Sequence, residues 1–342
     1  YAAKAVKIAE TLNSAPDLLY AITSTSYLKL QTGDPLASEA IAKDLLIDRA
    51  KFLQTNHYMN LVGNTCYNLI TRGRFHDAFE YAKLIIKKTE NSSSELVRVH
   101  IYNAIVGVIH SILGFPTEAE HFFSKVRNSG SLEPEMLYNW SNYMFWRLIN
   151  AYETGHLEPE VQELYERWKK AKISPLLVSF HHRVMYVMLC YIEIDKCFTA
   201  YSTNQPYNLK ALKTFIGDLK MINLVGAFVG HKYAILGAYE ILKNNNVAGL
   251  KILEKADYYS NQYDSIWGLL ESNRFRAHCY AKERKKLLAF SYFEFAYSIS
   301  LKTGSVHRPK RLIKEFQPYG IELPSDQLMT SRDTFSFLVI LI

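Results

Sequence analysis

The sequence contains no run of 18 or more apolar residues, the length at which a segment is read as a membrane-spanning helix. Its N-terminus has neither the basic region nor the hydrophobic run of a secretory signal peptide. The chain begins at Tyr1 rather than at a methionine, and we interpret it as a piece of a longer polypeptide. A chain without a membrane span is therefore expected.

Cysteine is scarce as well. The 342 residues include four cysteines, which show no paired spacing and lie in apolar helical contexts. A thiol in such a position behaves as a small hydrophobic group rather than as half of a disulfide. We therefore expect a reducing, cytoplasmic location.

Neither sign of charge is in large excess. The 40 basic and 33 acidic side chains give a formal net charge of +7, so only a weak preference for acidic partners follows. The densest basic clusters, at 282–286 and 308–311, fall at helix ends or turns, where we expect solvated side chains. Nucleic acid is not an expected partner, because it needs a continuous basic stripe with aromatic side chains placed for stacking.

Motifs of catalytic and cofactor sites are also missing. The string nearest to a phosphate-binding loop, 226–233, has the wrong spacing and ends in tyrosine, so we interpret it as a helix packed closely on a neighbour. His181 and His182 are adjacent, and neighbours on a helix point about 100° apart, which does not favour a shared metal. Asp195 and Cys197 have no histidine at a supporting spacing. We expect no catalytic residue, no metal and no cofactor.

What the sequence does contain is a glycine at a nearly constant interval. Gly33, Gly73, Gly114 and Gly155 lie 40, 41 and 41 residues apart, and each ends one stretch of helical pattern and precedes another. Glycine commonly ends a helix, and the proline or large apolar residue that follows can begin the next one. A fixed period of this size is typical of stacked helix pairs.

The pattern predicts an all-α fold of about seven helix pairs. A single pair cannot cover its own apolar face, so neighbouring pairs should share a core and curve into a right-handed superhelix, a tetratricopeptide-like solenoid. We expect one domain over residues 1–320, with 321–342 as a C-terminal extension or a truncated element. First helices are expected at 16–32, 57–72, 95–113, 135–154, 175–195, 222–243 and 265–281, and second helices at 36–54, 75–89, 116–127, 159–172, 209–220, 247–262 and 285–303.

Two segments interrupt the period. Residues 196–208 are polar and include Pro206, so they are interpreted as a long loop inside the fifth pair, either functional or disordered. Near the end, Pro309, Pro318, Gly320 and Pro324 are expected to stop the helices. The apolar segment 335–342 that follows is expected to dock on the last pair or to begin a truncated element.

Several local strings resemble known repeats. The strings 61–64 (LVGN) and 73–82 (GRFHDAFEYA) resemble a tetratricopeptide repeat, in which an alanine five residues after the glycine lets the paired helices approach closely. Ala119 repeats this spacing, whereas Glu160 departs from it. The longer period, together with 17–21 (DLLYA) and the region 273–316, is similar to the helical region of large signal-transduction ATPases, which include maltose-regulon-type activators, multidomain kinases and soluble adenylyl cyclases.

That resemblance implies a regulatory or sensory arm. In the family, the helical region binds an inducer or a partner protein and controls a module elsewhere in the polypeptide, so no catalytic residue carries over. The alternative is a free-standing adaptor or scaffold that holds an extended peptide in a concave groove. A helical enzyme, the third class, would need a deep polar pocket with clustered titratable groups.

The polar feature that carries most weight is a stripe of asparagines. Asn60, Asn64 and Asn68 are spaced four apart on one face of a helix, although asparagine is a poor helix former. The alternative is a solvated helix face in an asparagine-rich protein. If first helices line the concave side, these amides could hold a partner peptide. The predicted partner-binding surface comprises Asn60, Asn64, Asn68, Arg72, Arg98, Asn142, Arg147 and Asn150.

Overall fold

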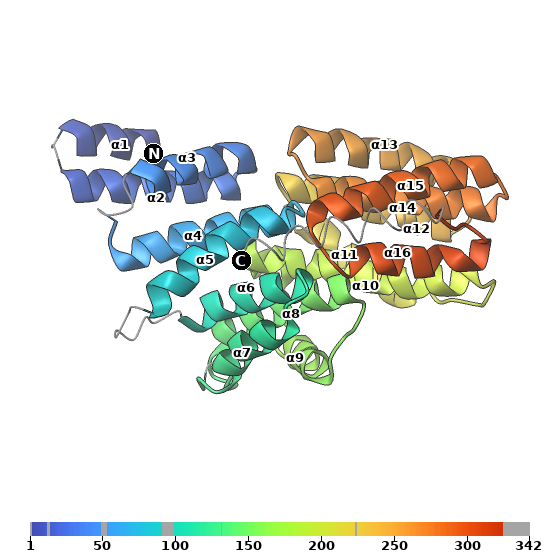
Figure 1. Ribbon diagram of the computed structural model, residues 1–342, viewed down its shortest axis with the longest axis horizontal. Coiled ribbons are helices and arrows are strands. Elements are labelled where there is room, and N and C mark those ends of the chain that lie inside the picture. Colours follow the sequence, from blue (N-terminus) through green and yellow to red (C-terminus); the bar gives the residue numbers. More distant parts are fainter. Residues whose placement is uncertain are drawn as a thin grey trace.

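The computed structural model describes residues 2–11, 14–48, 53–90, 99–130, 132–222 and 224–323. Over these residues the chain forms 16 α-helices and no strand, so the prediction of an all-α fold is confirmed (Figure 1). Arg98 and the apolar segment 335–342 lie outside the described residues, as does all but the first three residues of the predicted extension.

Fourteen of the described helices correspond to the predicted first and second members. The first members are α2 (Ala15–Gln31), α4 (Thr55–Thr71), α6 (Val99–Ile112), α8 (Leu137–Thr154), α10 (Arg183–Ser202), α12 (Ala227–Leu242) and α14 (Ile266–Lys282). The second members are α3 (Pro35–Asp48), α5 (Phe75–Glu90), α7 (Pro116–Arg127), α9 (Pro159–Lys170), α11 (Lys210–Met221), α13 (Asn246–Gln262) and α15 (Lys286–Thr303). Two further helices, α1 (Ala2–Thr11) and α16 (Arg308–Phe316), were not predicted.

The turn between two paired helices has a left-handed residue at a recurring position. Gly33, Gly73, Gly114 and Gly155 have φ of +92°, +82°, +90° and +76°. The same conformation recurs without glycine at Asn204, Asn244 and Arg284, which are again 40 residues apart. Asparagine tolerates this conformation, whereas for an ordinary side chain such as that of Arg284 it costs roughly 1–2 kcal/mol.

Small residues let the two helices of a pair cross closely. They lie seven residues before the turn and five after it, as at Cys66 and Ala78, where the thiol is 3.7 Å from the backbone oxygen of Ala78. In the first pair Ser26 donates to the backbone oxygen of Ser38 at 3.0 Å. In the sixth pair, a Cβ on Gly249 would lie 2.9 Å from the backbone oxygen of Gly237. Larger side chains at these positions would push the paired helices apart.

The fifth pair differs from the prediction. Instead of one helix over 175–195, the chain forms two short 3-10 turns, η2 (Pro175–Leu177) and η3 (Phe180–His182), and then α10. The predicted loop at 196–208 is wrong for its first half, which continues α10 to Ser202. Cys197, Phe198 and Tyr201 are buried, so the apolar face of the helix carries on through a stretch that is polar only on its other side.

The C-terminal prolines also behave differently from the prediction. Pro309 does not stop a helix but stands at the second residue of α16, where the backbone N–H that proline lacks would have no partner inside the helix. The cluster 308–311 is not solvated as expected, because Arg308 is buried and Arg311 is partly buried. A short 3-10 turn, η4 (Gln317–Tyr319), follows α16. Leu312 and Phe316 pack against Phe293 and Ile321 in a small apolar cluster.

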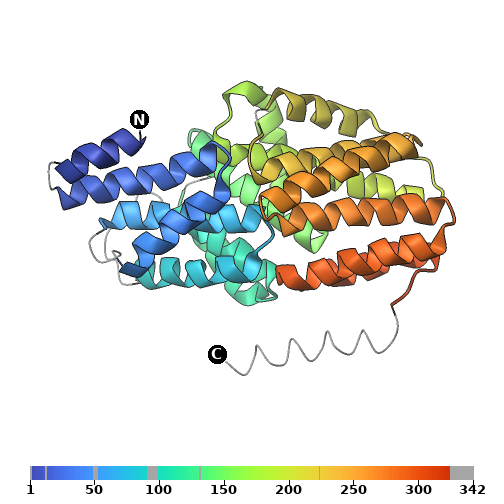
Figure 2. The same cartoon turned by 90° about the horizontal axis from the view of Figure 1, so that it is seen from above.

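The helices do not stack as an open row, since the ends of early helices face the beginnings of late ones (Figure 2). Each of the four turn glycines lies against a residue of the second half of the chain, namely Gly226, Trp267, Val306 and Arg311 in order. We call this set of contacts the closing interface. It joins the turns after α2, α4, α6 and α8 to residues 225–311.

Helix ends are satisfied across the closing interface. The last carbonyl groups of a helix have no partner within it and need donors from elsewhere. Trp267 N–H donates to the carbonyl of Arg72 at 3.1 Å, and Val306 N–H donates to that of Ile112 at 3.0 Å. The Arg311 guanidinium donates to the carbonyls of Tyr152 and Glu153. Three consecutive first helices therefore have their C-terminal ends capped by the second half of the chain.

Candidate binding site

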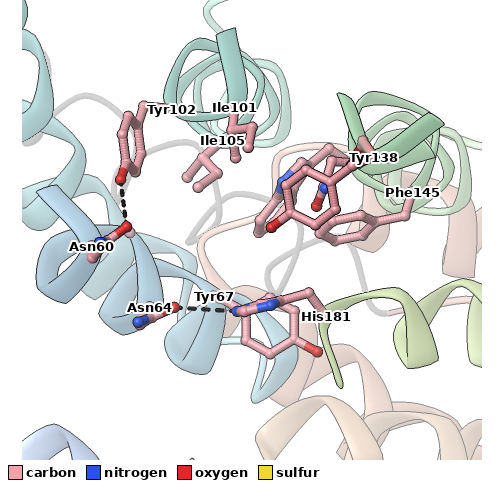
Figure 3. A pocket seen from close by; sticks show the side chains of 12 residues that line it. Asn60, Asn64, Tyr67, Ile101, Tyr102, Ile105, Tyr138, Phe145 and His181 are labelled. Atoms are coloured by element: carbon pink, nitrogen blue, oxygen red, sulfur yellow. Dashed lines mark hydrogen bonds between the residues drawn. The ribbon is translucent and has the colours of Figure 1, made fainter. Parts of the chain in front are cut away.

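A small cavity opens between α4, α6, α8 and η3 (Figure 3). Its volume is about 60 Å³, and no Asp, Glu, Lys or Arg is among the described residues that line it. Its rim includes Tyr138, which is 44% exposed, while Tyr67, Phe145 and Trp146 are buried beneath. The lining is therefore aromatic and amide in character and carries hydrogen-bonding groups without fixed charge.

Two residues of the predicted stripe stand on the α4 side of this cavity. Asn60 accepts a hydrogen bond through Oδ1 from the Tyr102 hydroxyl at 2.9 Å. Asn64 lies one turn further along the helix, and its Oδ1 is 3.2 Å from Nε2 of His181, which donates (Figure 3). Both amides are half-buried, and these bonds fix their orientation, with the oxygen held and the amino group left over.

Asn142 of α8 lines the same cavity from the other side. Its Nδ2 donates to the carbonyl of Tyr138 at 2.7 Å, one turn earlier in the helix. Within the part of the chain that the structure describes, Oδ1 of Asn142 has no hydrogen-bond partner, although the residue is only 3% exposed. Three of the eight predicted residues, Asn60, Asn64 and Asn142, are thus brought together.

Asn68 and Arg72 of α4 lie away from the cavity and are buried. Asn68 donates through Nδ2 to the carbonyl of Pro35 at 2.8 Å, which ties α4 to the start of α3. Arg72 forms ion pairs with Glu39 at 2.5 Å and with Asp264. The side chains of Asn68 and Arg72 therefore connect neighbouring elements of the fold, and neither is accessible to a partner in this conformation.

Arg147 and Asn150 of α8 are buried as well, at 1% and 5% exposure. The Arg147 guanidinium is paired with Glu158 and stacks 3.9 Å from the centre of the Phe123 ring. Asn150 has an Oδ1 without a partner among the described residues. The seven of these residues that the structure describes therefore do not form one exposed concave surface.

The groove expected on the inner side is filled by aromatic side chains. Tyr67 of α4 lies at its centre, with ring contacts to Phe145 and Trp146 of α8, Phe180 of η3 and Phe228 of α12. Edge-to-face contacts of this kind favour a fixed arrangement. An extended peptide could not occupy this space without displacing the rings, and the cavity beside Tyr67 is what remains open.

Sequence reasoning missed the aromatic part of the cavity. Tyr102, Tyr138 and His181 come from three different elements, and nothing in their local sequence marks them as neighbours. One signal was available: His181 follows Phe180 at an irregular place in the fifth pair, where the helical pattern is weakest. His181 faces Asn64, whereas His182 is buried against Ser141 and Ser179, so the adjacent histidines do point in different directions.

A second polar cluster, made of buried arginines paired with carboxylates, lies beside the closing interface. Arg274 of α14 contacts Asp195, Glu271 and Glu315, and Arg308 of α16 contacts Glu153 and Glu271. Burial alone would raise the pKa of Glu315, but Arg274 and His278 beside it lower that pKa well below its usual range. The arrangement joins α8, α10, α14 and α16, and we interpret it as the polar part of the closing interface.

Two buried histidines make stability depend on pH. Burial lowers the pKa of both His182 and His231 to about 4. His231 donates from Nε2 to the carbonyl of Thr71 at 3.2 Å and accepts at Nδ1 from the Tyr191 hydroxyl at 2.8 Å, so it is held neutral. In the unfolded chain each would take up a proton near pH 6.5.

The contribution of these two histidines to stability is therefore expected to be constant above about pH 7 and to fall as the pH drops from about 6.5 towards 4, because the unfolded chain binds more protons there. Each of these two histidines should contribute a loss of about 2 kcal/mol between pH 7.5 and pH 5. Urea unfolding at the two pH values measures this change. His231→Gln should remove part of the pH dependence and the exposed His156→Gln should not; an unchanged slope in His231→Gln would contradict the assignment.

None of the helices in the described ranges is long and apolar enough to span a bilayer. Comparison with protein-family models, with curated proteins and with solved structures finds no match. What the chain does is therefore inferred from its own geometry.

Proposed function

We propose that this chain is a non-catalytic, regulatory helical-repeat domain that binds a protein or peptide partner, with the cavity between α4, α6, α8 and η3 as its anchoring site. The observation that carries the proposal is the lining. It offers amide groups and ring faces, which suit recognition, in a space of about 60 Å³. That space is far below the roughly 300–1,000 Å³ of typical small-molecule pockets, so one side chain of a partner fits it better than a whole ligand.

We further propose that the fold is a tetratricopeptide-like right-handed superhelix of seven pairs that has closed on itself. The recurring left-handed turn residue supports this proposal, and so do the small residues that cross twelve positions apart, such as Cys66 and Ala78. Glu160 stands where most other pairs have a small residue five positions after the turn, and it differs from them in the structure too. Its side chain is 30% exposed and contacts Tyr143. A shared turn and a shared helix crossing are what repeats of one origin would keep.

The regulatory role in a larger cytoplasmic signalling protein stays part of the proposal. The closing interface supports it, because buried ion pairs between distant segments are stabilised only while both sides are in place. A partner that prefers one arrangement of the two halves could shift their equilibrium. The free-standing adaptor remains the alternative, and the two differ in whether the parent polypeptide has an ATPase, kinase or cyclase module.

Selection from a random peptide library displayed on phage tests the binding function directly. Binders are expected to lose about tenfold in affinity on Tyr138→Ala, since truncating an aromatic side chain that binding buries typically costs more than about 1 kcal/mol. Tyr138 is at the exposed rim, so the variant should fold. Tyr258→Ala, an exposed tyrosine of α13, serves as the matched control. Binders equally sensitive to both variants, or to neither, would place the site elsewhere and overturn the proposal.

A further inference from the structure

The polar atoms left over in the cavity form a specific pattern. The oxygens of Asn60 and Asn64 are bonded to Tyr102 and His181, which leaves their two Nδ2 amino groups without a hydrogen-bond partner among the described residues. Asn142 has its Nδ2 occupied by the Tyr138 carbonyl, which leaves one Oδ1 acceptor. The residues that line the cavity therefore offer two amide donors from α4 and one amide acceptor from α8.

The volume of the cavity and the charge of its lining restrict further which chemical group can occupy it. A volume of about 60 Å³ corresponds to about four to six water-sized positions. A carboxylate or an ammonium group would enter without an Asp, Glu, Lys or Arg as counter-ion, because none of these is among the described lining residues. An apolar group would leave the two remaining Nδ2 amino groups and the remaining Oδ1 atom unpaired. The buried rings of Tyr67, Phe145 and Trp146 provide apolar contact for a short stem.

We propose that the cavity recognises a primary carboxamide, supplied by the side chain of a glutamine in the partner peptide. The carbonyl of the carboxamide would accept from Asn60 and Asn64, and its amino group would donate to Asn142. Two methylene groups let a glutamine reach the buried rings from a backbone that stays outside the rim at Tyr138. This inference rests on the proposed peptide-binding function and adds the chemistry of the anchoring side chain.

The test uses N-acetyl-glutamine N-methylamide as the probe, with the corresponding glutamate and leucine compounds for comparison. Binding is followed by ¹H–¹⁵N NMR of the Asn64 side-chain amide and the Trp146 indole. We expect saturable shifts with the glutamine compound and at least about tenfold weaker binding of the other two, the effect of one lost hydrogen bond or more. Equal binding of the leucine or glutamate compound, or no shift with the glutamine compound, would overturn the inference.

A matched pair of variants locates the effect. Asn64→Asp keeps the shape and the oxygen that His181 contacts but replaces the donor by a carboxylate oxygen. It should abolish the response to the glutamine compound. Asn56→Asp makes the same change on an exposed position two turns earlier in α4 and should leave the response intact. If both variants behave alike, the donor role of Asn64 is wrong, and urea unfolding of each variant checks that the fold is kept.

The outcome separates this inference from the binding function. Selected peptides that need Tyr138 but share no glutamine would sustain peptide binding and overturn the carboxamide. If the glutamine compound binds but no selected peptide depends on Tyr138, carboxamide recognition would stand and peptide binding would be overturned. The ligand would then be a small free amide.

Discussion

Replacing Arg274 by methionine is expected to lower the free energy of unfolding by about 3–5 kcal/mol, because it removes the cation that three carboxylates share and leaves Glu315 without an arginine partner. The guanidinium, 2% exposed, lies 2.8 Å from Glu271 and 2.6 Å from Glu315 and also pairs with Asp195. Glu271 is fully buried. Methionine fills similar space, so the loss should come from the charges rather than from a void.

Urea unfolding at pH 7 measures the effect, and Lys83→Met provides the control. Lys83 pairs with Glu80 on the surface of α5, where both side chains are more than half exposed. Such a pair contributes about 0–1 kcal/mol. If Arg274→Met lowers the free energy of unfolding no more than Lys83→Met does, the ion pairs around Arg274 do not stabilise the packing of the two halves of the chain.

Gly73→Ala is expected to lower the free energy of unfolding by about 2–5 kcal/mol, from two separate causes. The residue has φ of +82°, which disfavours any side chain. A Cβ there would also lie 2.8 Å from Cβ of Trp267 and 3.0 Å from its backbone nitrogen. Backbone atoms cannot move aside cheaply, so α4 and α14 must separate.

Gly130→Ala isolates the first cause from the second. Gly130 has φ of +68°, but an alanine Cβ at this position would meet no atom of the described residues within 4 Å. Only the conformational cost of roughly 1–2 kcal/mol therefore applies. Hydrogen exchange of the Trp267 amide, which donates to Arg72, gives a local readout. Exchange should accelerate in Gly73→Ala and not in Gly130→Ala; equal behaviour would mean that the closing interface does not depend on this contact.

The sequence predicted the helices well because their boundaries have local causes. Glycine marks the left-handed turns in the first four pairs, and the period was lost where Asn204, Asn244 and Arg284 take the same conformation. Those positions carry no glycine, so only the backbone reveals that the interval continues.

What the helices pack against could not be predicted in the same way. Asn60 and Asn64 of the α4 stripe both line the cavity whereas Asn68 bonds to Pro35, and a spacing of four says nothing about what covers each position. Arg308 pairs with Glu153, 155 residues away, and Arg311 with Asp195, 116 residues away. From their neighbours in sequence alone, both arginines looked like part of a solvated turn. A short stretch of sequence does not indicate which residues more than 100 positions away will contact it.

The closing interface also bears on how the chain folds. In an open row of repeats each unit touches only its neighbours, so folding can begin anywhere and the ends can fray independently. Here Arg72 bonds to Asp264 across 192 residues and His307 to Ser111 across 196. Contacts of such separation slow folding, because the chain must first close a long loop. This protein should therefore fold more slowly than its helical content suggests, and shortening it at either end should uncap helices in the other half.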